Sequence, residues 1–211
     1  MRSLSRSQMR GNVLPPKLME GARGRMLKTS LQLFARQGFH GTSVRDITNA
    51  LEIQPSALYA HFESKEDLLA QLLCGGYEFH HETLRGAALG AGADPVKQLQ
   101  ALVRSNATFH ATYPVLAIVL HEESHVLDFS RTEGARVLRE QSLALLSDVI
   151  TRAVAQERCK TVDVATTLAA IGAMAIRIPY WFSAASALTV ADLGDAQAQL
   201  ALRMLGISNT R

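Results

Sequence analysis

The chain has 211 residues, of which 47% are hydrophobic and 19% charged, with a formal net charge of +3. This length suits a small domain joined to a larger one and is sufficient to bury a substantial core. Two cysteines argue against a disulfide framework or a structural zinc site. No apolar run approaches a membrane span, and the N-terminus lacks the apolar stretch of a signal peptide. We therefore expect a cytoplasmic protein with no membrane partner.

Positive charge gathers near the N-terminus. Residues 1–50 contain nine Lys or Arg against two acidic residues, a net charge of +7, which leaves −4 for the rest of the chain. Such asymmetry indicates either a phosphate-binding surface or a solvated segment without a partner. Residues 1–16 are rich in Arg and Ser and include two prolines, so we expect a flexible basic tail. If the chain binds DNA, this tail lies along phosphates or in a minor groove.

A first helix is predicted from about residue 17 to residue 37. Its apolar residues recur at helical spacing: Leu27, Leu31, Phe34 and Ala35. Gly38 follows at the position of a left-handed C-terminal cap, whereas Gly21 and Gly24 leave the start of the helix open. The apolar stripe is expected to cover the inner faces of the two helices that follow.

Residues 43–62 contain two short helical patterns joined by a tight turn. Ser43 and Asp46 form a capping box, which is followed by apolar residues at helical spacing: Val44, Ile47 and Leu51. Residues 52–54 are long enough only for a turn, and Pro55 suits the first position of a second helix over residues 55–61. Two helices joined in this way are typical of a helix-turn-helix, whose second helix enters the DNA major groove.

Two runs of sequence resemble the DNA-binding domain of the tetracycline-repressor (TetR) family, namely L-F-A-R-Q-G-F-H-G-T-S-V-R-D-I and I-Q-P-S-A-L-Y-A-H-F-E-S-K-E-D-L. The resemblance covers residues 27–73, and its most specific parts are G-F-x-x-T-S and L-Y-x-H-F-x-S-K. It implies an all-α transcriptional regulator, most often a repressor, rather than an enzyme. We expect a three-helix DNA-binding domain over residues 17–74 and a helical effector-binding and dimerisation domain over residues 75–211.

Eight residues are predicted to contact DNA. Thr42 and Ser43 lie at a helix N-terminus, where a phosphate is favoured, and Lys65 offers a second phosphate anchor. The others are the proposed base readers Gln54 and Ser56, Arg45 from the preceding helix, and the polar groups Tyr59 and His61. The resemblance implies that Tyr59 and Lys65 contact the DNA backbone.

The second helix of the motif departs from the family pattern. Gln54 occupies the place of a small N-cap residue, and Pro55 that of a polar or basic one. Ala57 and Ala60 supply no hydrogen-bond donors. With few strong base readers, we expect contacts with thymine methyl groups and DNA shape to carry much of the specificity.

A second capping box, Ser64 and Asp67, opens a helix predicted to run to about Arg85. The pair Gly75–Gly76 is expected to interrupt it, either as a hinge or as a point of close helix packing. Residues 86–93, G-A-A-L-G-A-G-A, are predicted to be a connector, so the domain boundary is placed between residues 74 and 94.

The remaining chain is predicted to be helical, with no strand. The expected helices cover residues 94–113, 114–120, 130–156, 162–182 and 189–206. The last two are rich in small apolar residues, which suits either packing within one subunit or a four-helix interface between two subunits. TetR-like proteins dimerise through their last two long helices, so the resemblance favours a homodimer.

A competing pattern, H-E-x-x-H, occurs at His121, Glu122 and His125. On a helix this spacing puts two imidazoles and a general base on one face, as in zinc proteases. A third ligand would come from Glu133 or Glu140. A regulatory metal site would instead add His110 or the pair His80 and His81, and the remaining alternative is that these histidines bind no metal.

An effector pocket is predicted between helices of the C-terminal domain. Its expected lining combines aromatic, apolar and cationic side chains: Phe109, Tyr113, Leu116, Leu146, Arg177, Trp181 and Phe182. Arg177 lies in an apolar helix and is expected to pair with Glu122, Asp148 or an anionic ligand. The runs F-H-A-T-Y-P-V-L and W-F resemble a TetR subgroup that responds to fatty acyl or steroid-derived acyl-CoA compounds, which implies an elongated apolar effector with an anionic head. The further alternative for the whole chain is a helical binding protein whose N-terminal domain has lost its affinity for DNA.

Overall fold

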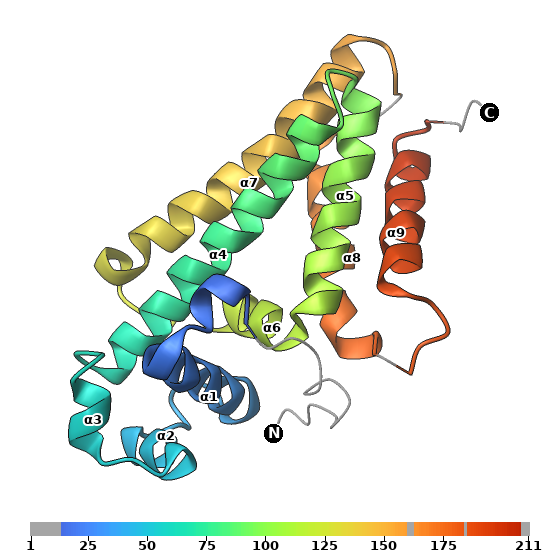
Figure 1. The fold of residues 1–211 in the computed structure, drawn as a ribbon. Helices are drawn as coiled ribbons and strands as arrows, with labels where there is room; N and C mark the ends of the chain where they lie inside the picture. Colours follow the sequence, from blue (N-terminus) through green and yellow to red (C-terminus); the bar gives the residue numbers. More distant parts are fainter. Residues whose placement is uncertain (1–13, 160–162, 184, 208–211) are drawn as a thin grey trace. The chain divides into compact units, whose positions relative to one another are not determined.

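A computed structural model describes residues 14–159, 163–183 and 185–207 (Figure 1). None of these residues forms a strand, and the all-α expectation is confirmed. After a short 3-10 helix, η2 (Pro16–Leu18), the helices are α1 (Gly21–Gln37), α2 (Val44–Leu51), α3 (Pro55–Tyr59), α4 (Lys65–Gly90), α5 (Pro95–Thr112), α6 (Pro114–Glu122), α7 (Phe129–Ala155), α8 (Val164–Trp181) and α9 (Val190–Met204). The predicted flexible tail lies mostly outside the described residues.

The described chain divides into two compact units. The first takes the residues up to Phe79 together with Tyr113–Val137, and the second takes His80–Thr112 together with the residues from Leu138 onward. The first unit therefore holds α1, α2, α3 and α6, and the second holds α5, α8 and α9. Each unit has its own buried apolar side chains.

Helix α1 buries the predicted stripe, with Leu27, Leu31 and Phe34 each at most 2% exposed. The helix ends where Gly38 adopts a positive φ of 75° and its N–H donates to the Phe34 carbonyl. It starts at Gly21 rather than residue 17, because Pro16–Leu18 form the separate helix η2 and Glu20 is extended. A Cβ on Gly24 would lie 2.2 Å from the backbone carbon of Met19, so only glycine fits there.

Helix α4 runs without a break through Gly75 and Gly76, so the predicted interruption is wrong. A Cβ on Gly75 would lie 2.6 Å from a Leu18 methyl group, and one on Gly76 would lie 2.8 Å from a methyl group of Leu120 on α6. The pair therefore permits close packing on two sides of α4. The predicted connector is also misplaced, since α4 continues to Gly90.

In the second unit, α5 packs against α9 and α8, and Figure 1 shows α9 alongside α5. A Cβ on Gly194 of α9 would lie 2.9 Å from Cγ of Arg104 on α5, so glycine allows these two helices to approach closely. The main core cluster of this unit draws on α4, α5, α7, α8 and α9, with Leu99, Ile150 and Ala201 fully buried.

Candidate DNA-binding surface and effector groove

The N-terminus of α2 is fixed by the predicted capping box. The Ser43 hydroxyl oxygen accepts from the Asp46 N–H at 3.1 Å, and the Asp46 carboxylate accepts from the Ser43 N–H at 2.8 Å. The Ser43 hydroxyl also donates to this carboxylate at 2.6 Å. These hydrogen bonds lower the pKa of Asp46, because they stabilise its charged form. The local sequence thus determines where α2 begins.

A tight turn separates α2 from α3. Glu52 ends α2 in the left-handed conformation, with φ of 56°, and the Ile53 N–H donates to the Thr48 carbonyl. Pro55 then occupies the first turn of α3. Leu58 and Phe62 are buried, with exposures of 1% and 2%, and they anchor α3 to the rest of the first unit. The predicted helix-turn-helix is therefore present.

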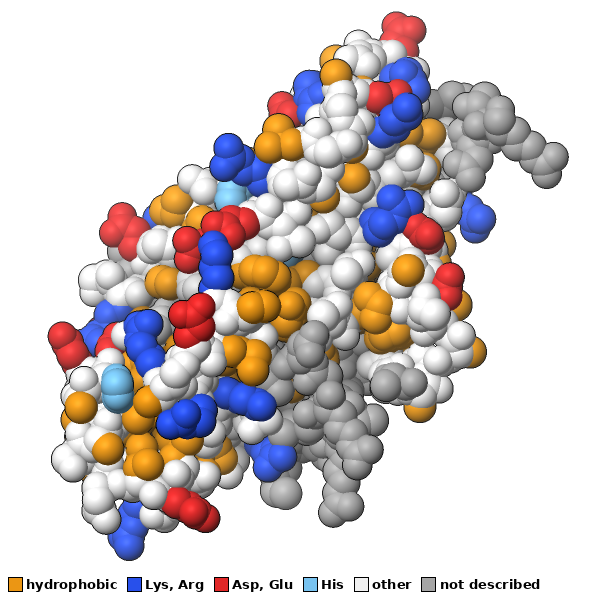
Figure 2. Space-filling model, in the orientation of Figure 1, with side chains coloured by type: hydrophobic (Ala, Val, Ile, Leu, Met, Phe, Trp, Pro, Cys, Tyr) orange, Lys and Arg blue, Asp and Glu red, His pale blue; other side chains and the backbone are white. Residues whose placement is uncertain are grey.

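Six of the eight predicted DNA contacts lie exposed on this motif. They are Ser43, Arg45, Gln54, Ser56, Tyr59 and His61, and the Tyr59 side chain is 53% exposed. Figure 2 shows basic, acidic and histidine side chains among uncharged ones over α2 and α3. Ala57 and Ala60 are exposed between them, so this face of α3 combines polar groups with methyl groups.

Thr42 and Lys65 are placed differently from the other six. Thr42 is 1% exposed, and its hydroxyl donates to the Gly38 carbonyl at 2.9 Å. Lys65 is partly buried, and its ammonium donates to the carbonyls of Phe39 at 2.9 Å and Thr42 at 2.8 Å. Both side chains thus bond to the turn between α1 and α2.

The H-E-x-x-H pattern does not lie on one helix. Helix α6 ends at Glu122, and residues 123–127 form turns and bends, so His121 and His125 do not share a helical face. Within residues 14–159, 163–183 and 185–207, no group of three or more His, Cys, Asp or Glu side chains is arranged to hold a metal ion. The geometry does not favour the metal-binding alternative.

The predicted effector residues are divided between the two units. Tyr113 and Leu116 belong to the first unit, whereas the other five belong to the second. Arg177 is exposed, and its guanidinium carbon lies 4.5 Å from the centre of the Tyr180 ring. Phe109 and Phe182 are buried, and Trp181 is 54% exposed.

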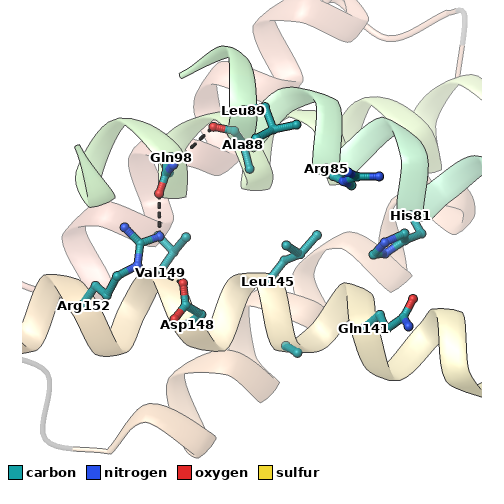
Figure 3. A pocket seen from close by; sticks show the side chains of 11 residues that line it. His81, Arg85, Ala88, Leu89, Gln98, Gln141, Leu145, Asp148, Val149 and Arg152 are labelled. Carbon is teal, nitrogen blue, oxygen red and sulfur yellow. Dashed lines mark hydrogen bonds and ion pairs between the residues drawn. The ribbon is translucent and has the colours of Figure 1, made fainter. Parts of the chain in front are cut away.

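A groove of about 640 Å³ lies between α4 and α7 in the second unit, with Gln98 of α5 at one end (Figure 3). Its apolar side chains are Ala88, Leu89, Ala144, Leu145 and Val149, and its polar side chains are His81, Arg85, Gln98, Gln141, Asp148 and Arg152. Figure 3 shows His81, Arg85 and Leu89 on α4 facing the α7 side chains Gln141, Leu145 and Asp148.

The arginine at one end of the groove is held in place. Arg152 donates to the Asp148 carboxylate at 2.8 Å and to the Gln98 side-chain oxygen at 2.6 Å, while the Gln98 amide donates to the Ala88 carbonyl at 3.3 Å. Sequence reasoning missed these residues. The sequence pattern that indicates the groove is two polar pairs, His81 with Arg85 and Asp148 with Arg152. The members of each pair are four residues apart and so lie on the same helix face.

Helices α8 and α9 leave apolar side chains exposed. On α8 these include Ala169, Ala173 and Tyr180, and on α9 they include Ala196, Leu200 and Met204, at spacings that put each set on one helix face, while Trp181 is exposed next to Tyr180. Helix α8 has a mean hydropathy of 1.2 and only 22% of its residues are buried, so by length and composition it is comparable to a membrane span, contrary to the sequence expectation.

Comparison with known proteins identifies the family. A model described as "Bacterial regulatory proteins, tetR family" matches residues 26–72, and a model described as "Tetracyclin repressor-like, C-terminal domain" matches residues 92–205. The second match covers more than half of the chain, so the chain belongs to the TetR family of bacterial regulatory proteins. This confirms the resemblance and the regulatory class inferred from the helix-turn-helix.

Individual relatives support the same assignment. The transcriptional repressor KstR2 of Rhodococcus jostii (strain RHA1) is 32% identical over 108 residues, covering 51% of this chain and 52% of the relative. KstR2 of Mycobacterium tuberculosis (strain CDC 1551 / Oshkosh) is 35% identical over 80 residues, covering 38% and 40%. The chain thus spans about half or less of the curated relatives that it matches.

Solved structures share the fold. A tetR-family regulatory protein from Rhodococcus RHA1 superposes with a TM-score of 0.80 at 22% identity, covering 88% of this chain and 97% of that one. AibR in complex with isovaleryl coenzyme A and operator DNA gives 0.75 at 22% identity, covering 87% and 97%. At these identities the likeness concerns the fold alone.

Proposed function

We propose that the protein is a cytoplasmic, sequence-specific transcriptional repressor that binds operator DNA as a homodimer. The observation that carries the proposal is the α2–turn–α3 motif. Leu58 and Phe62 of this motif are buried, while its six polar side chains are exposed. One such motif has little affinity alone, whereas two protomers related by a two-fold axis place their α3 helices in successive major grooves. Family membership supports this function.

The proposed contacts divide by chemistry. Ser43 lies at the N-terminus of α2, where free N–H groups and the helix dipole favour a phosphate. Gln54 and Ser56 are the proposed base readers, because Gln pairs with adenine through two hydrogen bonds. Tyr59 and His61 are assigned to the phosphate backbone, and Arg45 to either backbone or base edge. We omit Thr42 and Lys65 because their polar groups bond within the protein.

Titration of the DNA that flanks the protein's own gene tests this assignment. Gln54→Ala is expected to weaken specific binding by roughly 1–3 kcal/mol and to leave non-specific binding unchanged. Tyr59→Phe removes only a hydroxyl and is expected to weaken binding to all sequences alike. An affinity for the flanking DNA that equals the affinity for unrelated DNA contradicts the proposal.

We further propose that the groove between α4 and α7 binds the effector, an elongated apolar molecule with an anionic head such as an acyl or acyl-CoA compound. Arg85, Arg152 and His81 offer donors to an anion, while Leu89, Leu145 and Val149 offer apolar surface. The presence of isovaleryl coenzyme A with AibR, which shares the fold, is consistent with this class. A ligand that binds one conformation of the repressor better releases it from DNA.

Calorimetry with a medium-chain acyl-CoA, free coenzyme A and the free fatty acid tests the groove. Arg85→Gln is expected to weaken acyl-CoA binding about tenfold through loss of a charge-assisted hydrogen bond. Arg139→Gln is the matched control, since Arg139 is exposed on α7 outside the groove. Equal weakening by both variants, or none by either, contradicts this location.

A further inference from the structure

Lys65 is the first residue of α4, yet its ammonium interacts with the chain that precedes α2. Nζ donates to the Phe39 carbonyl at 2.9 Å and to the Thr42 carbonyl at 2.8 Å. It also lies 4.1 Å from the centre of the Phe39 ring. Two carbonyl oxygens and an aromatic face thus surround one cation, and each of these groups attracts positive charge.

The helix dipoles account for the direction in which the Lys65 side chain extends. A cation at the N-terminus of α4 is disfavoured by that helix, although Glu66 and Asp67 follow in its first turn. The ammonium instead reaches the chain just beyond the C-terminus of α1, where a positive charge is favoured. The position of Lys65 is therefore suited to bridging two elements rather than to stabilising its own helix.

The residues that Lys65 contacts form the short turn between α1 and α2. Phe39 is 4% exposed and Thr42 is 1% exposed. The Thr42 N–H donates to the Phe39 carbonyl at 3.2 Å, and its hydroxyl donates to Gly38. Apart from these local bonds, the Lys65 ammonium ties the turn to α4. Ser43, the N-cap of α2, follows immediately, so a shift of the turn would displace the N-terminus of α2.

We propose that Lys65 is a positioning residue of the DNA-binding surface, which clamps the Phe39–Thr42 turn to α4 so that Ser43 and Arg45 meet the DNA in register. The proposal rests on the proposed DNA-binding function and replaces the sequence-based expectation of a phosphate anchor. An ammonium has three N–H donors, and two are committed to carbonyls. Only the third donor is then left for a phosphate oxygen, while the other two hold the turn.

Lys65→Met tests the clamp, because it keeps the apolar stem and removes the donors. Without DNA, the Thr42 amide is expected to exchange hydrogen about tenfold faster relative to the Leu69 amide in the core of α4. Taking the ratio to Leu69 corrects for global destabilisation. Lys65→Arg, which retains donors, is expected to preserve Thr42 protection. Arg45→Gln, the matched loss of an exposed charge, is expected to leave Thr42 exchange unchanged.

Salt titration of DNA binding separates positioning from phosphate contact. Lys65→Met is expected to lower the affinity about tenfold at every salt concentration with little change in the salt slope. A phosphate anchor would instead reduce that slope by about 0.9, and a merely stabilising residue would leave the affinity of the folded protein unchanged. Either of these outcomes overturns the proposal.

The exchange experiment also distinguishes this proposal from the function on which it rests. If the wild-type protein binds no DNA, the proposed function fails, whereas faster Thr42 exchange in Lys65→Met still supports the clamp. Unchanged Thr42 exchange in Lys65→Met overturns the clamp whatever the DNA result.

Discussion

Gly75 and Gly76 show how single residues determine the packing of α4. A Cβ on Gly76 would meet Leu120 at 2.8 Å and Leu116 at 3.1 Å, both on α6. Because these neighbours are packed in the first unit, a larger side chain forces them to move. The alternative of a hinge requires a broken helix, and α4 is continuous at this point.

Gly76→Val is therefore expected to lower the free energy of unfolding by about 1–3 kcal/mol through overpacking. Gly86→Ala is the matched control on the same helix, since a Cβ there meets nothing within 4 Å. Its expected effect is a gain of roughly 0.5–1 kcal/mol from helix propensity. Chemical denaturation measures both, and a Gly76→Val protein as stable as wild type would contradict the packing.

His80 gives a residue-scale dependence on pH. Its ring nitrogen is 2.9 Å from the Asn106 side-chain oxygen, and its ring centre lies 4.6 Å from that of Phe109, with the two ring planes tilted by 46°. Desolvation lowers the pKa of His80 to about 4, because it disfavours the charged ring. The unfolded chain, with a pKa near 6.5, then binds more protons than the folded chain as the pH falls below 6.5.

Stability is consequently expected to fall by roughly 1–3 kcal/mol between pH 7 and pH 4 on account of His80 alone. Denaturation of wild-type and His80→Gln proteins at both pH values isolates this contribution. The wild-type protein should lose more stability than the variant. Identical losses would mean that His80 is not desolvated.

At the scale of elements, local chemistry determines α2 and its neighbours. Ser43, Asp46 and Pro55 act on adjacent backbone groups, so the capping box and the start of α3 were predictable from sequence. The end of α4 was not, because composition suggested a connector where Ala87 and Ala88 continue the helix. The groove was also missed, since Arg85 and Arg152 belong to helices that are brought together only by tertiary packing.

Ser43→Ala removes the N-cap of α2 and is expected to cost about 1 kcal/mol of stability. Ser56→Ala is the matched control, because Ser56 is exposed on α3 and is assigned to DNA rather than to a cap. Its expected effect on stability is below about 0.5 kcal/mol. Thermal unfolding compares the two, and equal stability would show that the capping box is not needed.

For the whole molecule, the exposed apolar faces of α8 and α9 are the proposed subunit interface. Leu200 and Met204 are 43% and 44% exposed and lie one turn apart on α9. Such a face, together with the exposed alanines of α8, allows helices of two subunits to pack closely. This proposal accounts for the low burial of α8 without a membrane.

Leu200→Arg is expected to shift the protein from dimer to monomer, because it buries an unpaired charge in the interface. Leu89→Arg is the control, since Leu89 is 71% exposed but lies on α4. Sedimentation velocity measures the change. A Leu200→Arg protein that remains dimeric would place the interface elsewhere.

The central claim is that two protomers bind one operator through their α2–α3 motifs. Sedimentation of the protein with DNA flanking its gene, over a series of salt concentrations, tests this claim most directly. We predict two protomers per duplex and an affinity that falls steeply with salt. The plot of the logarithm of the binding constant against the logarithm of the salt concentration should have a slope of about −0.9 for each phosphate neutralised. A complex with one protomer, an affinity independent of salt, or no complex at physiological salt would contradict the account.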